Sequence, residues 1–375
     1  MLNKLKKIII FLISYFIIDF ALSYLFLFNL IFLDLEKIYQ SDIQNRIFNK
    51  DYKYTFKPNV SFMSKYNDYI YKIETNNFGY RDEKIRKIKH SENLYLFAGD
   101  SFLEGVGLNF EDTLLGHLNN KIKKKKILLN SGMASYSPFI YKKKIISFIE
   151  NNQNHKPERV VIIFDKSDPM DDQQYLNHTG KFKENTYDSK YKKNLSEKFI
   201  FFAFVKILAN YLDEKGRDFK YRYKLSKDFN SSFFSFTQNQ VTAFKSIGNR
   251  RFVSNYYTDS QKWNNETKNF IMNSFHHIKN LDLYLSSKKI KLDIIIYPWS
   301  FELVNKNVMN DYLKFINELS TSNNLTVHSC YDYFINKEIL DQLEFIGKTY
   351  LFADVHYNST GYEILAECIK NKLKL

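Results

Sequence analysis

Two segments near opposite ends of the chain carry residues suited to nucleophilic catalysis. An apolar run ends in Gly-Asp-Ser, which places the hydroxyl of Ser101 at the carboxyl end of a predicted strand, and Asp354 and His356 stand two positions apart shortly before a predicted amphipathic helix. A serine hydroxyl is a poor nucleophile until a base takes its proton, and an imidazole can do this near neutral pH. We therefore predict that Ser101 is the nucleophile, His356 the base and Asp354 the orienting carboxylate.

The oxyanion that forms when a serine attacks an acyl group needs hydrogen-bond donors. The backbone N–H of Ser101 is one candidate. The backbone N–H of Gly132, in the Asn-Ser-Gly that follows a second apolar run, is another, because glycine allows close approach of the backbone. Both residues follow predicted strands, so we expect them to converge at one edge of a sheet.

Short apolar runs and amphipathic stretches alternate along the chain in the manner of a parallel sheet covered by helices. The predicted strands are residues 94–98, 126–130, 159–164, 292–296 and 325–328, and the predicted helices are residues 113–122, 139–151, 271–285, 311–319 and 361–373. The sequence thus predicts an α/β fold of three αβα layers around a five-stranded parallel sheet.

One region before the predicted domain of residues 94–375 and two regions within it have their own sequence patterns. Residues 37–93 form a polar and aromatic lead-in that we expect to pack on the core as strands or loops. Residues 171–263 read as an insertion with one clear helix at 198–212, which is interpreted either as a lid or substrate platform or as a surface excursion. Residues 297–300, Tyr-Pro-Trp-Ser, follow the fourth strand and form either an aromatic floor for a sugar ring or part of the core edge.

The N-terminal residues 1–36 have the pattern of a membrane anchor. Lys4, Lys6 and Lys7 precede the almost wholly apolar residues 8–33, a run long enough to cross a bilayer of about 30 Å. This predicts a single-pass cell-membrane protein with its catalytic domain outside the cytoplasm. A cleaved signal peptide is the alternative, since residues 21–23, Ala-Leu-Ser, resemble a cleavage site.

The formal net charge of +14 comes from lysines scattered among Asn, Ile, Phe and Tyr, without a nucleic-acid motif, so we expect a solvated basic surface and no nucleic-acid partner. The two cysteines, Cys330 and Cys368, lack metal-type spacing, and whether they pair stays open. The adjacent His276 and His277 also lack the i, i+4 spacing of a zinc site, so no metal and no cofactor is predicted.

The motifs resemble those of the SGNH, or GDSL, hydrolase superfamily. Residues 99–101, Gly-Asp-Ser, match the first block of that family, Gly132 matches the glycine of the second block, and Asp354 with His356 matches the last block. The resemblance covers about residues 94–375 apart from the insertion, and it implies the three-layer fold and an ester-cleaving or acyl-transferring serine site.

The chain departs from this family pattern in two places. The third block, Gly-x-Asn-Asp in the family, falls at residues 165–168 and retains only its final Asp, so that Ser167 stands where the oxyanion-hole asparagine would be. We expect the Ser167 hydroxyl to serve as a third oxyanion donor. The Asp-x-His spacing is one residue shorter than usual, and it is similar to that of membrane-linked alginate O-acetyltransferases.

The resemblance implies an O-acyltransferase or O-acylesterase that acts on a surface polysaccharide or cell-wall glycan. Its expected partners are the cytoplasmic membrane, the glycan and a membrane protein that donates the acyl group. A catalytically weak protein that binds glycan or serves as a scaffold in polysaccharide assembly is the alternative, and the missing asparagine favours it. A lipase or thioesterase is a third reading, although no apolar acyl channel follows from the sequence.

Overall fold

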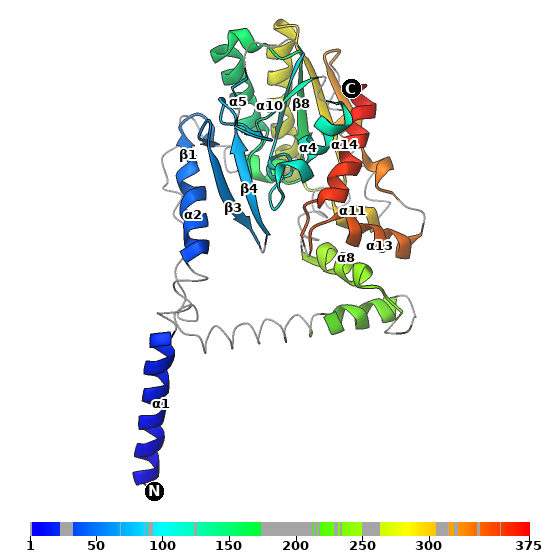
Figure 1. Cartoon of the computed structure of the whole chain (residues 1–375). Coiled ribbons are helices and arrows are strands. Elements are labelled where there is room, and N and C mark those ends of the chain that lie inside the picture. Colours follow the sequence, from blue (N-terminus) through cyan, green and yellow to red (C-terminus); the bar gives the residue numbers. More distant parts are fainter. Residues whose placement is uncertain are drawn as a thin grey trace. The chain divides into compact units, whose positions relative to one another are not determined.

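Apolar runs form the centre of one large β-sheet in this chain, which we describe from a computed structural model (Figure 1). Every residue of β6 (Leu94–Gly99) is buried, as are all but the first residue of β8 (Arg159–Phe164) and of β9 (Lys291–Ile296). Strands that bury both faces read as continuous apolar runs, because helices cover a parallel sheet on both sides.

The structure describes residues 2–22, 33–67, 69–85, 87–88, 93–123, 126–173, 212, 216, 218–228, 232, 235–249, 263–304, 314, 316–318, 322–335, 338–352 and 354–375. The chain divides into two compact units. The first comprises Met1–Gln44 and Asn185–Phe234, and the second comprises Asn45–Glu184 and Ser235–Leu375. All the predicted site residues belong to the second unit. The predicted helix at 198–212 lies outside the described residues except for its last position, and the domain boundaries predicted at 36 and 93 stay predictions.

The sheet of the second unit has eight strands in the order β10-β9-β8-β6-β7-β5-β4-β3. Its remaining strands are β10 (Leu325–Ser329), β7 (Ile127–Asn130), β5 (Arg81–Asp82), β4 (Tyr69–Thr75) and β3 (Ser61–Tyr66). The strands from β10 to β7 are parallel to one another, and β5, β4 and β3 continue the sheet in antiparallel pairings. A separate two-stranded sheet pairs β1 (Arg46–Asn49) with β2 (Lys53–Phe56).

The predicted fold of a five-stranded parallel sheet is therefore wrong, because the sheet is mixed and has eight strands. The difference comes from the lead-in. Outside residues 94–375, β3 shows the exposed and buried alternation of a strand with one face on the core, which is typical of antiparallel sheets. The short β5 joins this hairpin to the parallel strands through Arg81, which pairs with Asn130 of β7.

Helices cover the sheet on two sides (Figure 1). Among the described residues, the first unit contains α1 (Leu2–Leu22) and nearly all of α2 (Leu33–Asn45). The described helices of the second unit are α3 (Ser101–Glu104), α4 (Leu114–Lys121), α5 (Pro138–Asn151), α6 (Asp168–Gln173), α8 (Gln238–Asn249), α10 (Asn265–Ser287), α11 (Ser300–Val304), α13 (Ile339–Thr349) and α14 (Ser359–Leu373), with 3-10 turns η2 (Phe110–Asp112), η3 (Gln153–His155) and η6 (Tyr331–Tyr333). In Figure 1, α5 and α10 lie on one side of β8, and α4 and α14 lie on the other.

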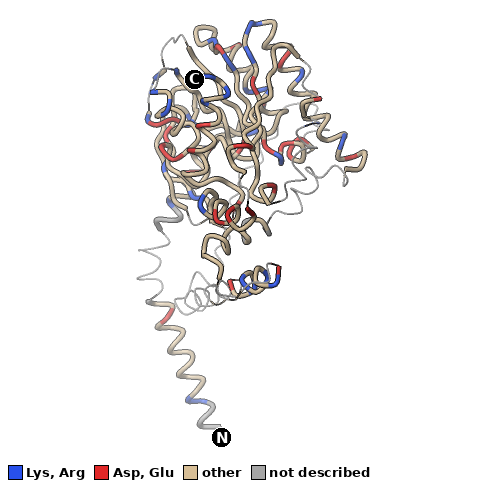
Figure 2. Tube along the Cα trace, turned by 90° about the vertical axis from the view of Figure 1, so that its right-hand side faces the viewer, with Lys and Arg blue, Asp and Glu red and all other residues tan. Residues whose placement is uncertain are grey.

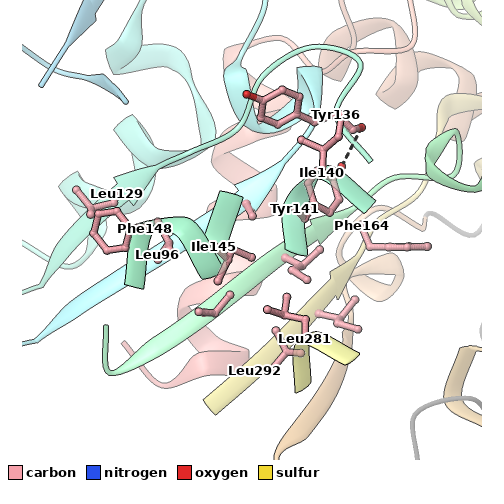
Figure 3. Packing of buried hydrophobic residues seen from close by; sticks show 14 of the residues in the cluster. Leu96, Leu129, Tyr136, Ile140, Tyr141, Ile145, Phe148, Phe164, Leu281 and Leu292 are labelled. Carbon is pink, nitrogen blue, oxygen red and sulfur yellow. Dashed lines mark hydrogen bonds between the residues drawn. The ribbon is translucent and has the colours of Figure 1, made fainter. Parts of the chain in front are cut away.

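The core lies between the sheet and α5 with α10. Figure 3 shows Ile140 and Ile145 of α5 and Leu281 of α10 pointing towards side chains of the strands, among them Leu96 and Leu292. All of these side chains are buried completely. This packing holds the strands in register, so that their carboxyl ends, which carry the candidate catalytic residues, form one edge.

The predicted membrane anchor is not supported. Among the described residues, no helix is both long and apolar enough to span a bilayer. The helix α1 ends at Leu22, and residues 23–32 of the predicted apolar run lie outside the described residues. The single-pass topology, and the cell-membrane localisation that was predicted from it, are corrected accordingly.

The structure also shows how the two cysteines and the charged residues are placed in the described chain. Cys330 and Cys368 form a disulfide, with their Cα atoms 5.8 Å apart, that ties the segment after β10 to α14. Figure 2 shows Lys and Arg on many elements, interspersed with Asp and Glu rather than gathered in one patch. The basic charge is therefore spread over the described chain.

Candidate active site

Ser101 stands at the turn between β6 and α3, and the local sequence shapes that turn. The Asp100 side chain caps α3 by accepting a hydrogen bond of 3.0 Å from the backbone N–H of Phe102. Gly99 is required for close packing, because a Cβ atom at this position would lie 2.8 Å from Cβ of Leu103. Gly105, with φ of 77°, ends the helix in the left-handed conformation. These constraints hold Ser101 at the carboxyl end of the strand.

The structure brings together the three residues that the sequence predicted as a catalytic set. Nε2 of His356 lies 2.8 Å from Oγ of Ser101, within hydrogen-bond distance, and Nδ1 of His356 lies 2.5 Å from Oδ1 of Asp354. With Asp354 accepting from Nδ1, the ring proton stays on that nitrogen, and the lone pair of Nε2 faces the serine hydroxyl. This is the geometry in which an imidazole removes a serine proton.

The loop that carries Asp354 and His356 is held at both ends. Tyr350 and Tyr357 form an isolated antiparallel bridge across it. The Asn358 side chain caps α14 by accepting a hydrogen bond of 3.1 Å from the N–H of Gly361. Within the loop, the backbone N–H of His356 donates to Oδ1 of Asp354 at 3.0 Å. The short Asp-x-His spacing therefore forms a closed turn in which acid and base face each other.

Donors surround the carboxylate of Asp354. Its Oδ1 accepts from His356, and its Oδ2 accepts from the Tyr66 hydroxyl at 3.1 Å and from the Asn67 amide at 3.0 Å. Burial raises the pKa of this carboxyl, but the hydrogen bonds and charge of His356, together with the Tyr66 hydroxyl, lower the pKa overall to well below its usual range. Asp354 is therefore ionised throughout the neutral range and can stabilise a charged imidazole.

Aromatic rings enclose the imidazole of His356, which is only 4% exposed as a residue. The ring of Phe102 lies 4.6 Å away between centroids, and the ring of Tyr66 meets it edge-on at 5.2 Å. This enclosure limits the rotation of the imidazole and keeps water from most of its surface. Electrostatic interactions inside such a site are stronger than in bulk water.

The predicted oxyanion donors differ in availability. Ser101 is the first residue of α3, so its backbone N–H has no partner within the helix and can face a substrate. The backbone N–H of Gly132 instead donates to Oδ1 of Asn130 at 3.0 Å. The structure thus leaves the Ser101 donor available and ties the Gly132 donor to a neighbouring side chain.

The Ser167 hydroxyl is also engaged within the protein. It donates to Oδ1 of Asp165 at 2.6 Å, and the other oxygen of Asp165 accepts from the Tyr297 hydroxyl at 2.6 Å and from the Trp299 indole N–H at 2.7 Å. The altered third block therefore builds a buried polar cluster, in contrast to the free donor that we expected. Trp299 is 2% exposed, so it belongs to the core edge and offers no floor for a sugar ring.

A group of buried carboxyls lies behind the serine. Burial and neighbouring carboxyls raise the pKa of Asp100 and that of Asp168, and Asp168 accepts a hydrogen bond of 2.8 Å from the Tyr141 hydroxyl. Oδ2 of Asp100 lies 3.3 Å from Oγ of Ser101. Within the described residues, no cluster of His, Cys, Asp and Glu has a geometry that could hold a metal ion.

Tyr66 and Asn67 are site residues that the sequence reasoning missed. They lie about 290 positions before Asp354 in the sequence, at the tip of the β3–β4 hairpin. The alternation of apolar and polar residues from Tyr71 to Glu74 in β4 could have indicated a strand there. No local pattern connects the hairpin with the loop before α14.

No family model and no curated protein matches this chain. Solved structures that it is similar to include a G-D-S-L family lipolytic protein from Desulfitobacterium hafniense (12% identity, 75% of this chain and 99% of the other, TM-score 0.37). Two others are the esterase EstA from Pseudoalteromonas (10%, 76% and 97%, 0.38) and the acetylxylan esterase Axe2 from Geobacillus stearothermophilus (11%, 76% and 95%, 0.36). The first is described as a lipolytic protein of the G-D-S-L family, and the other two are described as esterases.

Proposed function

We propose that this protein is a serine-dependent enzyme that cleaves or transfers an O-acyl ester. The observation that carries the proposal is the continuous hydrogen-bonded chain from Oγ of Ser101 to Nε2 of His356 at 2.8 Å and from Nδ1 to Asp354 at 2.5 Å. A serine, a histidine and a carboxylate that are hydrogen-bonded in this order activate the hydroxyl as a nucleophile.

The first half of the reaction follows from this geometry. Nε2 of His356 takes the hydroxyl proton while Oγ of Ser101 forms a bond to the acyl carbon, and Asp354 stabilises the charged imidazole. The backbone N–H of Ser101 donates to the oxyanion. The ester C–O bond then breaks, and His356 returns the proton to the departing alcohol, which leaves an acyl ester on Ser101.

The second half decides between an esterase and a transferase. His356 removes a proton from water, or from a second alcohol, whose oxygen attacks the acyl carbon and releases Ser101 with its proton restored. Water yields a carboxylic acid, and an alcohol yields a new ester. The same side chains serve both outcomes, so the acceptor that reaches the acyl group sets the product.

We further propose that the acyl group is carried on a polysaccharide hydroxyl. The support is the short Asp-x-His turn formed by Asp354 and His356, which is similar to that of alginate O-acetyltransferases. Mass spectrometry of acetylated polysaccharides incubated with the protein, with and without an acyl donor, separates deacylation from transfer. If the protein alters no polysaccharide but cleaves small acetyl esters, only the substrate assignment is wrong.

A catalytically weak, glycan-binding protein remains the second candidate. The specific observation in its favour is that the N–H of Gly132 and the hydroxyl of Ser167 both donate within the protein, which leaves the oxyanion fewer donors. Losing one oxyanion donor typically lowers the rate by about 10²–10³. Binding of polysaccharide by a Ser101→Ala variant and by the wild type, with no turnover by either, is the result that this candidate requires.

Covalent labelling by a fluorophosphonate tests the catalytic proposal without knowledge of the substrate. We expect one label on Ser101 in the wild type, no label in Ser101→Ala, and a rate lower by about 10⁴ in Asp354→Asn, whose neutral amide no longer stabilises the charged imidazole. Ser61→Ala is the matched control, because Ser61 is an exposed serine on β3 outside the site. A wild type that stays unlabelled at high probe concentration refutes the proposal.

A further inference from the structure

The tip of the β3–β4 hairpin touches the loop that carries the acid and the base. The Tyr66 hydroxyl donates to Oδ2 of Asp354 at 3.1 Å and lies 3.2 Å from Nδ1 of His356, and the Asn67 amide donates to Oδ2 of Asp354 at 3.0 Å. The backbone N–H of Phe352 donates to the Tyr69 hydroxyl at 3.3 Å. The hairpin is thus joined to this loop by several polar contacts.

These contacts give both oxygens of the Asp354 carboxylate hydrogen-bond donors. Both donors that reach Oδ1, the ring and the backbone N–H, belong to His356, whereas the donors that reach Oδ2 belong to Tyr66 and Asn67. A carboxylate held through one oxygen can still turn about its last single bond. Donors on the second oxygen oppose that rotation and keep Oδ1 directed at Nδ1 of the imidazole.

The hairpin itself explains why these two residues can reach Asp354. Tyr66 and Tyr69 are the last paired residues of the hairpin, so both side chains stand at its tip. Asn67 follows with φ of 51°, a left-handed conformation that asparagine tolerates well in tight turns. The turn alone accounts for an asparagine at this position. The convergence of the Tyr66 and Asn67 side chains on Asp354, which is distant in the sequence, is not required by the turn.

A purely structural role for the Tyr66 hydroxyl would need only one partner. Tyr71, on the same hairpin, illustrates that case, because its hydroxyl is buried and meets the Ser64 hydroxyl at 3.4 Å. The Tyr66 hydroxyl instead reaches both the carboxylate and the imidazole, and its ring packs edge-on against the imidazole. These contacts with Asp354 and His356 favour one arrangement of the acid and the base.

The geometry points to Tyr66 and Asn67 as positioning residues of the proposed acyl-transfer site, which hold the Asp354 carboxylate in the orientation that His356 requires. The inference rests on the proposed function, since it assigns a role within the same site. Neither residue touches the reacting atoms. Because Nδ1 of His356 donates its proton to Asp354, it cannot accept one from the Tyr66 hydroxyl. Both residues therefore act through Asp354, and their effects should depend on the presence of that carboxylate.

A double-mutant cycle tests this dependence. We expect Tyr66→Phe to slow fluorophosphonate labelling of Ser101 by about tenfold, the effect of losing a hydrogen bond to a charged group. In the Asp354→Asn background the same change should slow labelling by less than about twofold, because the residues act as one unit. Tyr71→Phe is the matched control, and we expect it to leave the labelling rate within about twofold of the wild type.

The exposed Asn67 provides a second variant that does not disturb the core. Asn67→Asp replaces the donor by a second carboxylate of nearly the same shape, and we expect it to slow labelling more than Asn67→Ala does. With p-nitrophenyl acetate as the substrate, both changes should lower kcat and leave KM within about twofold. The positioning role is overturned if Tyr66→Phe and both Asn67 variants label at the wild-type rate, or if Tyr66→Phe slows labelling equally in the Asp354→Asn background.

A spectroscopic readout separates this inference from the proposed function. In protein labelled with ¹⁵N-histidine, the proton between Nδ1 of His356 and Asp354 should resonate far downfield and disappear in His356→Gln. Tyr66→Phe should shift this resonance, and Tyr71→Phe should leave it unchanged. If the wild type is not labelled at Ser101, the proposed function fails, and a resonance that Tyr66→Phe does not move refutes the positioning role independently.

Discussion

The ion pair between Arg46 and Glu104 allows a quantitative test of how the helix that carries Ser101 is held. Glu104 is the last residue of α3, and its side chain is completely buried. Its carboxylate accepts from the Arg46 guanidinium at 3.1 and 2.6 Å and from the backbone N–H of Ala134 at 2.7 Å. Arg46→Met removes the guanidinium and retains much of the aliphatic stem.

The expected cost is large because the remaining charge stays buried. Removing one partner of a buried ion pair typically costs about 3–5 kcal/mol in the free energy of unfolding. A surface pair such as Lys126 with Glu158, whose side chains are 25% and 49% exposed, is worth about 0–1 kcal/mol. Lys126→Met is therefore the control for loss of one positive charge, and we expect it to change stability by less than about 1 kcal/mol.

The unfolding free energy should also depend on pH, and a simple packing defect would not produce such a dependence. Burial raises the pKa of Glu104, but the charge and hydrogen bonds of Arg46, with the N–H of Ala134, lower the pKa overall. In the wild type this pair contributes stability that is present above the unfolded pKa of about 4.3 and is lost as the pH falls through the folded value. In Arg46→Met we expect burial to dominate, so that the pKa of Glu104 is higher in the folded state than in the unfolded state. The unfolding free energy of this variant should then fall as the pH rises above about 4.3.

Urea denaturation followed by tryptophan fluorescence at pH 5 and pH 8 measures this effect. We expect the difference in unfolding free energy between the wild type and Arg46→Met to be larger at pH 8 than at pH 5. Glu104→Gln in the Arg46→Met background should recover part of the loss at pH 8, because the buried group is then neutral. A cost below about 1 kcal/mol at pH 8, or one independent of pH, would show that the pair does not hold α3.

Three further predictions concern the second unit. We expect Ser167→Ala to change the labelling rate of Ser101 by less than about threefold, because its hydroxyl donates to Asp165 rather than to an oxyanion; a tenfold loss would restore Ser167 as a donor. Burial lowers the pKa of Lys144 from 10.5 to about 7 in the folded protein. Between these two pH values the Lys144 side chain binds more protons in the unfolded state than in the folded state. The unfolding free energy of the wild type relative to Lys144→Met should therefore rise by about 1.4 kcal/mol per pH unit between pH 7.5 and 9.5, and equal slopes in urea titrations would contradict this. Replacing Cys330 and Cys368 by serine opens a loop with a sequence separation of 38 and should cost about 4 kcal/mol in urea denaturation, whereas a midpoint like that of the wild type would mean that the cysteines are not paired in the purified protein.

The sequence alone located the central strands and the candidate catalytic residues. Apolar runs long enough to be buried on both faces predicted β6, β8 and β9. Gly-Asp-Ser at the end of the first run, and Asp-x-His before the last helix, predicted that Ser101 and His356 would meet. Such predictions succeed because strand burial and turn geometry depend mainly on neighbouring residues, and the carboxyl ends of parallel strands lie along one edge of the sheet.

The extent of the sheet was decided only in the tertiary structure. β3 and β4 form a hairpin in the structure, and their sequences do not state which edge of the sheet the hairpin joins. The contact depends on a single residue pair between β5 and β7, Arg81 with Asn130. Strands pair through backbone groups that every sequence shares, so the local pattern of the hairpin carried no signal for the edge that it joins.

The same reason explains which donors the site retains. Gly132 and Ser167 have the residue types that an oxyanion hole requires, but Asn130 and Asp165 accept their protons in the folded chain. Tyr66, which no motif identified, reaches the catalytic carboxylate from the hairpin. Residue types and spacing determine which side chains can act. The hydrogen-bond partners that leave a donor free or occupy it come from tertiary packing, because each polar group pairs with whichever group the fold places within reach.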